Sequence, residues 1–240
     1  MKKMLAIIAT LLLAGCAGQI NTKKDPRRGL APQSPTLVSQ SESAGATRNS
    51  PVLIRIFKQE HELELWRKDK TGQYVLVQAF PICKFSGEAG PKHVRGDRQA
   101  PEGFYTITAG QLNYNSIRWL SINTGYPNAF DRYHGSTGSA LMIHGGCDSA
   151  GCYAIEDGPM QDLFAAVRDS LRAGQHSVQL HIFPFRMSVL NMVAHSNQKT
   201  LWKKLKAEDF WHQLKAGYDL FEWSHQDLDV RVVNGRYIVK

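Results

Sequence analysis

The sequence predicts a mainly β fold that carries helical additions, and three features of the chain support this class. Beyond residue 50, several short segments alternate apolar and polar residues or form brief apolar runs, which is the pattern of strands. Stretches rich in glycine and proline connect them, as in a sandwich or barrel. In residues 200–223 the spacing becomes helical. We therefore expect one domain over residues 51–185 and a helix-and-hairpin extension over residues 186–240 packed on it.

The chain begins with a predicted secretory signal. In residues 1–16, MKKMLAIIATLLLAGC, two lysines precede an apolar run that is too short to span a membrane. The LAGC ending at Cys16 resembles the lipobox of bacterial lipoproteins, in which the signal is removed and the cysteine receives lipid. An ordinary cleaved signal with a chance cysteine is the alternative. Because Ala17 follows in place of aspartate, the resemblance implies a periplasmic protein anchored to the outer membrane through Cys16.

Residues 17–50 are predicted to form a disordered tether between that anchor and the domain. They are rich in Ser, Gln, Pro, Thr and Gly and show neither helical nor strand periodicity. Such a tether would let an anchored domain search a layer at some distance from its membrane.

The segments of the domain can be assigned in order along the chain. Residues 52–68 alternate in two halves around a polar KQEH, which predicts a hairpin. Further strands are predicted at residues 74–83, 104–110, 118–128, 139–146 and 177–185. Before the last of these, a helix is predicted with Pro159 in its first turn and Gly174 at its end. In the extension, residues 200–223 have helical spacing, and a hairpin turns at Asn234-Gly235.

The charge of the chain bears on its partners. The formal net charge is +8, with 29 lysines and arginines. In a cytosolic protein this positive charge would suggest nucleic acid as a partner, but an exported protein does not encounter nucleic acid. An anionic envelope polymer or a lipid surface is the expected counterpart, and a merely soluble basic surface is the alternative.

Residues 141–157, LMIHGGCDSAGCYAIED, place His144 before Cys147 and Cys152. A metal site that also used His134 would lack the tight cysteine pairing of structural zinc sites. A disulfide suits an exported protein, but only three thiols remain if Cys16 carries lipid, so at least one stays free. An unpaired thiol in that compartment suits catalysis.

A thiol nucleophile needs a base, donors for the oxyanion and an exposed backbone position. His144 ends an apolar strand, which is a rigid mount for a base, and SAGC offers a Ser-x-Gly turn beside Cys152. Cys147 lacks this turn and is followed by Asp148, whose charge disfavours a thiolate. The residues therefore favour Cys152 over Cys147 as the nucleophile.

With these residues in view, IHGG followed by SAGC resembles the signature of L,D-transpeptidase catalytic domains of the YkuD type. The stretch GPKHVRGDRQAPEGFYTI, in which Ala100 replaces a usual threonine, and DRYHGSTGSALMIHG resemble the YafK-like branch of that family. The likeness covers roughly residues 52–184. It implies a YkuD-type β sandwich and an exported enzyme that acts on peptidoglycan stem peptides without a metal ion or organic cofactor.

The resemblance implies roles for individual residues of the motif. Cys152 matches the nucleophile and His144 the base. The backbone amides of Gly151 and Cys152 match the oxyanion hole, and Ser149 belongs to the same turn. The glycines, Gly145 among them, would allow close approach of substrate.

One departure concerns substrate binding. Many members of the family have arginine two positions after the nucleophile to hold a substrate carboxylate, and here Ala154 stands there. Arg132, Arg98 or Arg95 would be replacements, because a guanidinium grips a carboxylate through two bonds. His134 would either orient substrate or brace its loop.

The implied reaction begins with attack of Cys152 on the amide carbonyl after the L-centre of diaminopimelate, which leaves a thioester. An amine would resolve the thioester by transpeptidation and water by hydrolysis, including release of a lipoprotein bound to the wall through diaminopimelate. The rival class is a non-catalytic, wall-binding lipoprotein whose cysteines form a structural bridge. A Cys147–Cys152 disulfide would favour that rival, a free Cys152 the enzyme, and a Cys83–Cys147 bridge would be compatible with catalysis.

Overall fold

The computed structural model describes residues 25–196 and 207–240. The predicted signal, with Cys16, and residues 17–24 of the predicted tether lie outside the described residues, as does the start of the helix expected at residues 200–223. None of the helices in the described ranges is long and apolar enough to cross a membrane.

The larger part of the fold is a five-stranded mixed sheet in the order β3-β2-β1-β10-β5. Neighbouring strands are antiparallel except β1 and β10, which run parallel. The predicted hairpin is present as β1 and β2, joined by a tight turn at residues 58–61. The five strands are β1 (Val52–Phe57), β2 (Glu62–Lys68), β3 (Tyr74–Pro81), β5 (Gly103–Ile107) and β10 (Val178–Phe183).

A second five-stranded sheet, in the order β4-β9-β8-β7-β6, carries the His and Cys motif. Its strands are β4 (Lys84–Phe85), β6 (Leu112–Asn113), β7 (Ser121–Asn123), β8 (Met142–His144) and β9 (Tyr153–Ala154). One hydrophobic cluster joins both sheets and a helix, with Ile54, Ile143 and Leu163 all fully buried. The predicted class of β sandwich with helical additions is confirmed.

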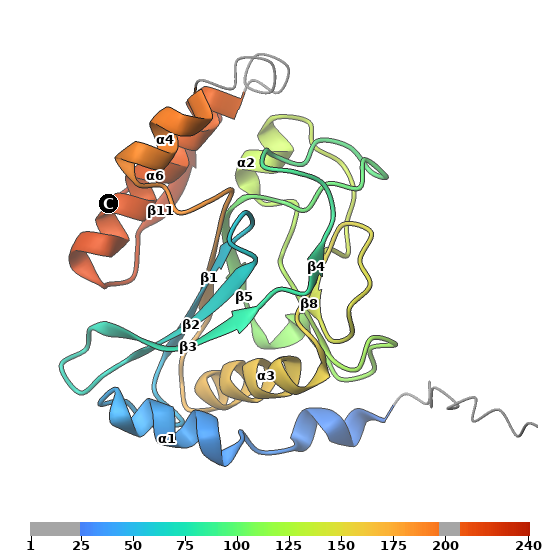
Figure 1. The fold of residues 1–240 in the computed structure, drawn as a ribbon, viewed down its shortest axis with the longest axis vertical. Coiled ribbons are helices and arrows are strands. Elements are labelled where there is room, and N and C mark those ends of the chain that lie inside the picture. Colours follow the sequence, from blue (N-terminus) through green and yellow to red (C-terminus); the bar gives the residue numbers. More distant parts are fainter. Residues whose placement is uncertain (1–24, 197–206) are drawn as a thin grey trace, which may run out of the picture.

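Helices cover the sheets at opposite ends of the molecule (Figure 1). Helix α3 (Asp157–Arg172) begins two residues before Pro159, which therefore lies in its first turn, and its apolar face packs on β1, β7 and β8. Figure 1 shows α3 on one side of the strands and the C-terminal helices on the other. The other helices among the described residues of the domain and extension are η2 (Ala109–Gln111), α2 (Ala129–Tyr133), α4 (Val189–Ser196) and α6 (Ala207–Ser224).

The described part of the predicted tether is not disordered, and this prediction is corrected for residues 25–50. A 3-10 helix, η1 (Pro26–Leu30), and the helix α1 (Pro35–Ser43) lie along α3 and β3 (Figure 1). Ser34 caps α1 and bonds to Asp162 of α3 through its amide and its hydroxyl, both at 2.7 Å. Arg168 of α3 donates to the carbonyls of Gly29 and Ala31 at 2.6 and 2.8 Å.

The composition of residues 25–50 does not predict their ordered structure. Hydrogen bonds to the domain hold this segment in place, and its own sequence has no apolar periodicity. Gln33 shows this, since its amide nitrogen donates to Asp169 at 2.8 Å and its oxygen accepts from the buried Arg67 at 2.7 Å. One apolar anchor, Leu37, is only 1% exposed. The segment behaves as part of the domain.

We expect Leu37→Ala to lower the free energy of unfolding by about 2–4 kcal/mol, because it leaves a cavity under α1. Leu30→Ala is the matched control, since Leu30 is 59% exposed in the same segment and should change the free energy by less than about 0.5 kcal/mol. Urea unfolding followed by circular dichroism measures both values. Equal, negligible effects would show that the segment does not dock in solution.

The C-terminal extension packs on the face of the larger sheet opposite to α3. The predicted hairpin is present as β11 (Val230–Val233) and β12 (Arg236–Val239), with Asn234 and Gly235 both at positive φ in the turn. A second hydrophobic cluster contains residues of α6, of this hairpin and of β1, β5 and β10. In it Phe130, Phe210 and Tyr237 pack ring against ring.

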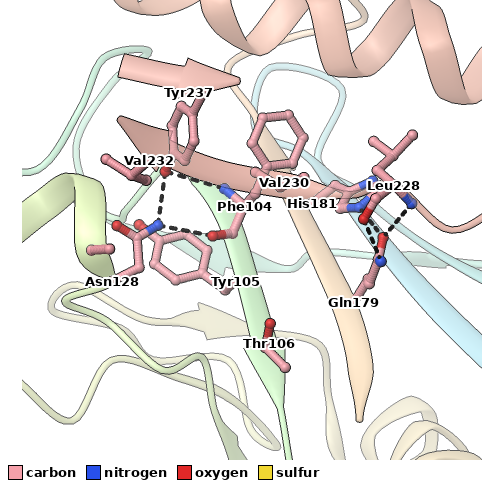
Figure 2. A pocket seen from close by; sticks show the side chains of 11 residues that line it. Phe104, Tyr105, Thr106, Asn128, Gln179, His181, Leu228, Val230, Val232 and Tyr237 are labelled. Atoms are coloured by element: carbon pink, nitrogen blue, oxygen red, sulfur yellow. Dashed lines mark hydrogen bonds between the residues drawn. The ribbon is translucent and has the colours of Figure 1, made fainter. Parts of the chain in front are cut away.

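Figure 2 shows a contact between the hairpin region and β5 and β10, around a cavity of about 210 Å³. Asn128 donates to the Phe104 carbonyl at 2.8 Å and to the Tyr237 hydroxyl at 2.7 Å. Gln179 pairs with the backbone of Leu228 through both its oxygen and its nitrogen. Side-chain amides thus tie the hairpin region to the larger sheet.

Candidate active site

Two neighbouring strands of the smaller sheet present His144 and Cys152 to the same cavity. His144 ends β8, and Cys152 directly precedes β9, which runs parallel to β8 with His144 opposite Ala154. On its other side β8 pairs with β7, where Ser121 lies opposite His144. Both side chains line a cavity of about 640 Å³. The two residues that the motif singled out therefore face one cavity, and their catalytic roles stay predictions.

His144 is held as a neutral base. Its Nδ1 lies 2.7 Å from the carbonyl oxygen of Gly145, and because a carbonyl only accepts, Nδ1 carries the proton and Nε2 is the basic nitrogen. Burial lowers the pKa of His144 below its ordinary value of 6.5, against the opposing effect of the bond to Gly145. The nearby Arg118 lowers it further. At neutral pH the imidazole is therefore uncharged.

Gly145 supports this histidine and does not line the cavity, which differs from its predicted place against substrate. A Cβ atom at Gly145 would lie 2.6 Å from a carboxylate oxygen of Asp157 and 2.8 Å from Cβ of Trp119. The same Asp157 oxygen accepts from the amide of Gly146 at 2.8 Å. Only glycine fits where the strand, the loop and α3 come together.

Cys152 is a half-buried thiol at rest. Its Sγ lies 3.9 Å from the carbonyl of Ala140, an acceptor for the S–H group. Burial raises the pKa of Cys152 above its ordinary value of 9.0, although the backbone amide of Met142 and the charge of Arg118 act in the opposite direction. A neutral thiol therefore faces the same cavity as the neutral imidazole.

The turn before Cys152 differs from the oxyanion hole predicted there. The amides of Gly151 and Cys152 both donate to the hydroxyl of Ser149, at 3.3 and 3.0 Å, and that hydroxyl donates to the Cys152 carbonyl at 2.7 Å. A serine three residues before the thiol reaches these amides because the turn is short. The oxyanion hole stays a prediction, and it requires both amides to leave Ser149.

The three cysteines of the described residues form one disulfide and leave one free thiol. Cys83 and Cys147 form a disulfide, and Cys152 is the free cysteine of the described residues. The bridge joins the entry to β4 with the loop that carries the motif, 64 residues later. Cys147 is therefore neither the nucleophile nor a thiolate metal ligand, and the Cys147–Cys152 bridge of the non-catalytic alternative is not formed.

Comparisons with known proteins show the family of this chain. Residues 51–179 match the family model of the L,D-transpeptidase catalytic domain, YkuD. The chain belongs to the L,D-transpeptidase family. It is 42% identical to YafK of Escherichia coli strain K12 over 237 residues, which cover 99% of this chain and 90% of that protein.

Two solved structures are more distant. Helical cell shape determining protein Pgp2 from Campylobacter jejuni aligns with a TM-score of 0.46 and 15% identity, over 82% of this chain and 80% of that one. Bd1075 from Bdellovibrio bacteriovorus aligns with a TM-score of 0.38 and 18% identity, over 80% and 77% of the two chains.

Two predicted substrate-binding residues, Arg132 and His134, are not among the residues that line the cavity beside Cys152. The guanidinium of Arg132 donates to the carbonyl of Pro127. His134 bonds to the carbonyl of Gly235 at 2.8 Å and packs on Phe130, so it braces the C-terminal hairpin. A structural role was one of the two predicted for His134, but the sequence did not reveal its partner, which lies 101 residues further along the chain.

The walls of the cavity are basic. Lys92, Arg95, Arg98 and Arg118 line it, with Asp148 as the one acidic side chain among its lining residues. Arg95 and Arg98 were predicted as candidates, whereas Arg118 was missed because no motif surrounds it. Arg118 donates to Asp148 at 2.8 Å. Ala154 is fully buried in β9.

The state of Cys152 can be tested by alkylation. We expect iodoacetamide to modify Cys152 about tenfold faster for each pH unit up to and beyond pH 9, because only the thiolate reacts and burial raises the thiol pKa. Mass spectrometry follows the modification, and Cys152→Ser is the control for the other thiols. A rate that is already constant from about pH 6 would instead indicate a preformed thiolate–imidazolium pair.

Proposed function

We propose that this protein is a cysteine acyltransferase that attacks the amide carbonyl at the L-centre of diaminopimelate in peptidoglycan stem peptides. Family membership supports an enzyme that acts on peptidoglycan. The observation that carries the proposal is the pairing, in one cavity, of a free thiol with a buried imidazole whose Nδ1 is already engaged. Nε2 is then the nitrogen available to Cys152.

The proposed reaction has two halves. His144 Nε2 takes the proton of the Cys152 thiol as the sulfur attacks the carbonyl, because both groups are neutral at rest. The imidazolium then gives this proton to the leaving amine, the C–N bond breaks, and a thioester remains on Cys152. In the second half an amine or water attacks the thioester, His144 accepts the incoming proton, and the thiol is restored.

Charge favours a substrate of this kind. Four basic side chains and one acidic side chain line the cavity, so its potential suits a peptide that carries several carboxylates. Stem peptides are such molecules, since their isoglutamate and diaminopimelate residues keep free carboxylates. No metal ion is required for a thiol and an imidazole to perform acyl transfer.

The test uses purified peptidoglycan, with and without covalently attached lipoprotein, and mass spectrometry of the soluble products and of the intact protein. The proposal expects an acyl adduct on Cys152 and loss of the residue that follows diaminopimelate. New cross-links identify an amine acceptor, and free diaminopimelate carboxyl groups or released lipoprotein identify water. Absence of both adduct and products with every substrate would overturn the proposal.

We also propose that the protein works from the periplasmic face of the outer membrane, held by lipid on Cys16. The support is the sequence of residues 1–16 with its lipobox-like end. Labelling cells with a palmitate analogue tests it. The wild type should carry label in the outer-membrane fraction and Cys16→Ser should carry none, whereas a labelled Cys16→Ser variant would contradict the anchor.

A further inference from the structure

We propose that Arg118 binds the carboxylate of the substrate residue that follows the scissile amide. In the free enzyme, the carboxylate of Asp148 binds Arg118 instead of the substrate carboxylate. The inference rests on the proposed function and names the group that selects its substrate. Asp148 Oδ2 lies 2.8 Å from a guanidinium nitrogen of Arg118, at the wall of the cavity that holds His144 and Cys152. A carboxylate is therefore already bound where a substrate carboxylate would sit.

Arg118 is fixed relative to the reacting groups. Its amide donates to the hydroxyl of Ser116 at 3.0 Å, and its carbonyl packs so closely on Gly145 that a Cβ there would lie 3.0 Å away. Three residues later β7 begins at Ser121, which is paired with His144. The backbone that carries the guanidinium is thus joined to the strand that carries the base.

The other basic groups of the cavity are placed less well for this role. Lys92 is engaged by Asp97 and by the carbonyl of Val94. Arg95 and Arg98 belong to an irregular segment between β4 and β5, whereas Arg118 is near enough to shift the pKa of both His144 and Cys152. Its planar guanidinium also matches a carboxylate through two bonds.

The pair with Asp148 is suited to exchange. The side chains of Arg118 and Asp148 are 45% and 65% exposed, and ion pairs at such positions contribute little to stability. When a substrate carboxylate takes Arg118, Asp148 still has Lys84, whose Nζ lies 3.9 Å from its other oxygen. Displacement therefore leaves no buried, unpaired charge.

The experiment compares two synthetic donors that differ in one group. Both are the stem peptide of alanine, isoglutamate, diaminopimelate and D-alanine, one ending in a free carboxylate and the other in a carboxamide. Release of D-alanine or D-alaninamide is measured as kcat/KM for wild type, Arg118→Ala, Arg118→Lys and Asp148→Asn. The matched control is the exposed pair outside the cavity, through Arg231→Ala and Asp229→Asn.

We expect the wild type to have a higher kcat/KM with the carboxylate donor than with the carboxamide donor. Arg118→Ala should lower the ratio of these two values about 30-fold. Arg118→Lys should recover part of it. Asp148→Asn should lower KM for the carboxylate donor about three- to tenfold without helping the carboxamide, because the competing group is gone. The control pair should leave the ratio unchanged.

The ratio of the two donors isolates carboxylate binding, since any general effect of Arg118 on Cys152 or His144 acts on both donors equally. An unchanged ratio in Arg118→Ala overturns the inference, as does an Asp148→Asn variant with a raised KM for the carboxylate donor. Both results leave the proposed function intact when the wild type still releases D-alanine. Failure of the wild type on both donors, without an adduct on Cys152, overturns the proposed function instead.

Discussion

Replacing Cys152 by alanine is expected to lower the rate of release from stem peptides at least about 10³-fold, because no other described thiol is free to form the acyl intermediate. Binding should survive, since the basic walls of the cavity do not depend on the sulfur. The measurement is single-turnover release of D-alanine by the folded variant, together with the intact mass of the protein. The melting temperature of Cys152→Ala should stay within a few degrees of the wild type.

The control for Cys152→Ala is the double variant Cys83→Ala/Cys147→Ala, which removes the disulfide and leaves no new thiol. It should be less stable by about 2–4 kcal/mol, because a long loop is no longer closed in the unfolded chain. It keeps the nucleophile, so at temperatures where it is folded it should still form the adduct on Cys152. An inactive double variant beside an active Cys152→Ala would reverse the assignment of the nucleophile.

The parts of the molecule that could be predicted from the sequence are those encoded locally. His144 ends β8 and Cys152, eight positions later, directly precedes the adjacent strand β9, so the short motif contains both groups and the turn between them. The hairpin at the start of the domain and α3 carry their own periodicity and turn residues, and both were found.

The parts that could not be predicted depend on partners distant in the chain. Arg118 meets Asp148 only because a loop of the smaller sheet folds over the motif. His134 and the segment before residue 50 are held by groups more than a hundred residues away, so neither periodicity nor composition reveals them. Glu102 is an intermediate case, because the Pro-Glu-Gly turn that carries it is visible in the sequence whereas its partners Lys58 and Trp211 are distant in the chain.

Glu102→Gln is expected to lower the free energy of unfolding by about 3–5 kcal/mol, because it breaks a buried ion pair. Glu102 is 1% exposed, and one of its oxygens accepts from the ammonium of Lys58 at 2.9 Å and from the amide of Gly90 at 2.6 Å. The other accepts from the indole of Trp211 in α6 at 2.9 Å. Glutamine removes the charge that balances Lys58 and turns an N–H group toward a donor.

The reason for so large an effect is that Lys58 has no access to water. Burial lowers the pKa of Lys58 and the neighbouring Glu102 raises it, so the ammonium depends on this carboxylate. Adding Lys58→Met to Glu102→Gln should therefore recover much of the loss, a coupling that denaturant unfolding of the two single variants and the double variant measures. Asp219→Asn, which breaks the exposed pair with Lys215, is the control and should cost less than about 1 kcal/mol.

Additive effects of Glu102→Gln and Lys58→Met would mean that the two charges do not stabilise one another. The junction between α6 and the segment that supplies Lys92, Arg95 and Arg98 to the cavity would then depend on the Trp211 and Gly90 bonds instead.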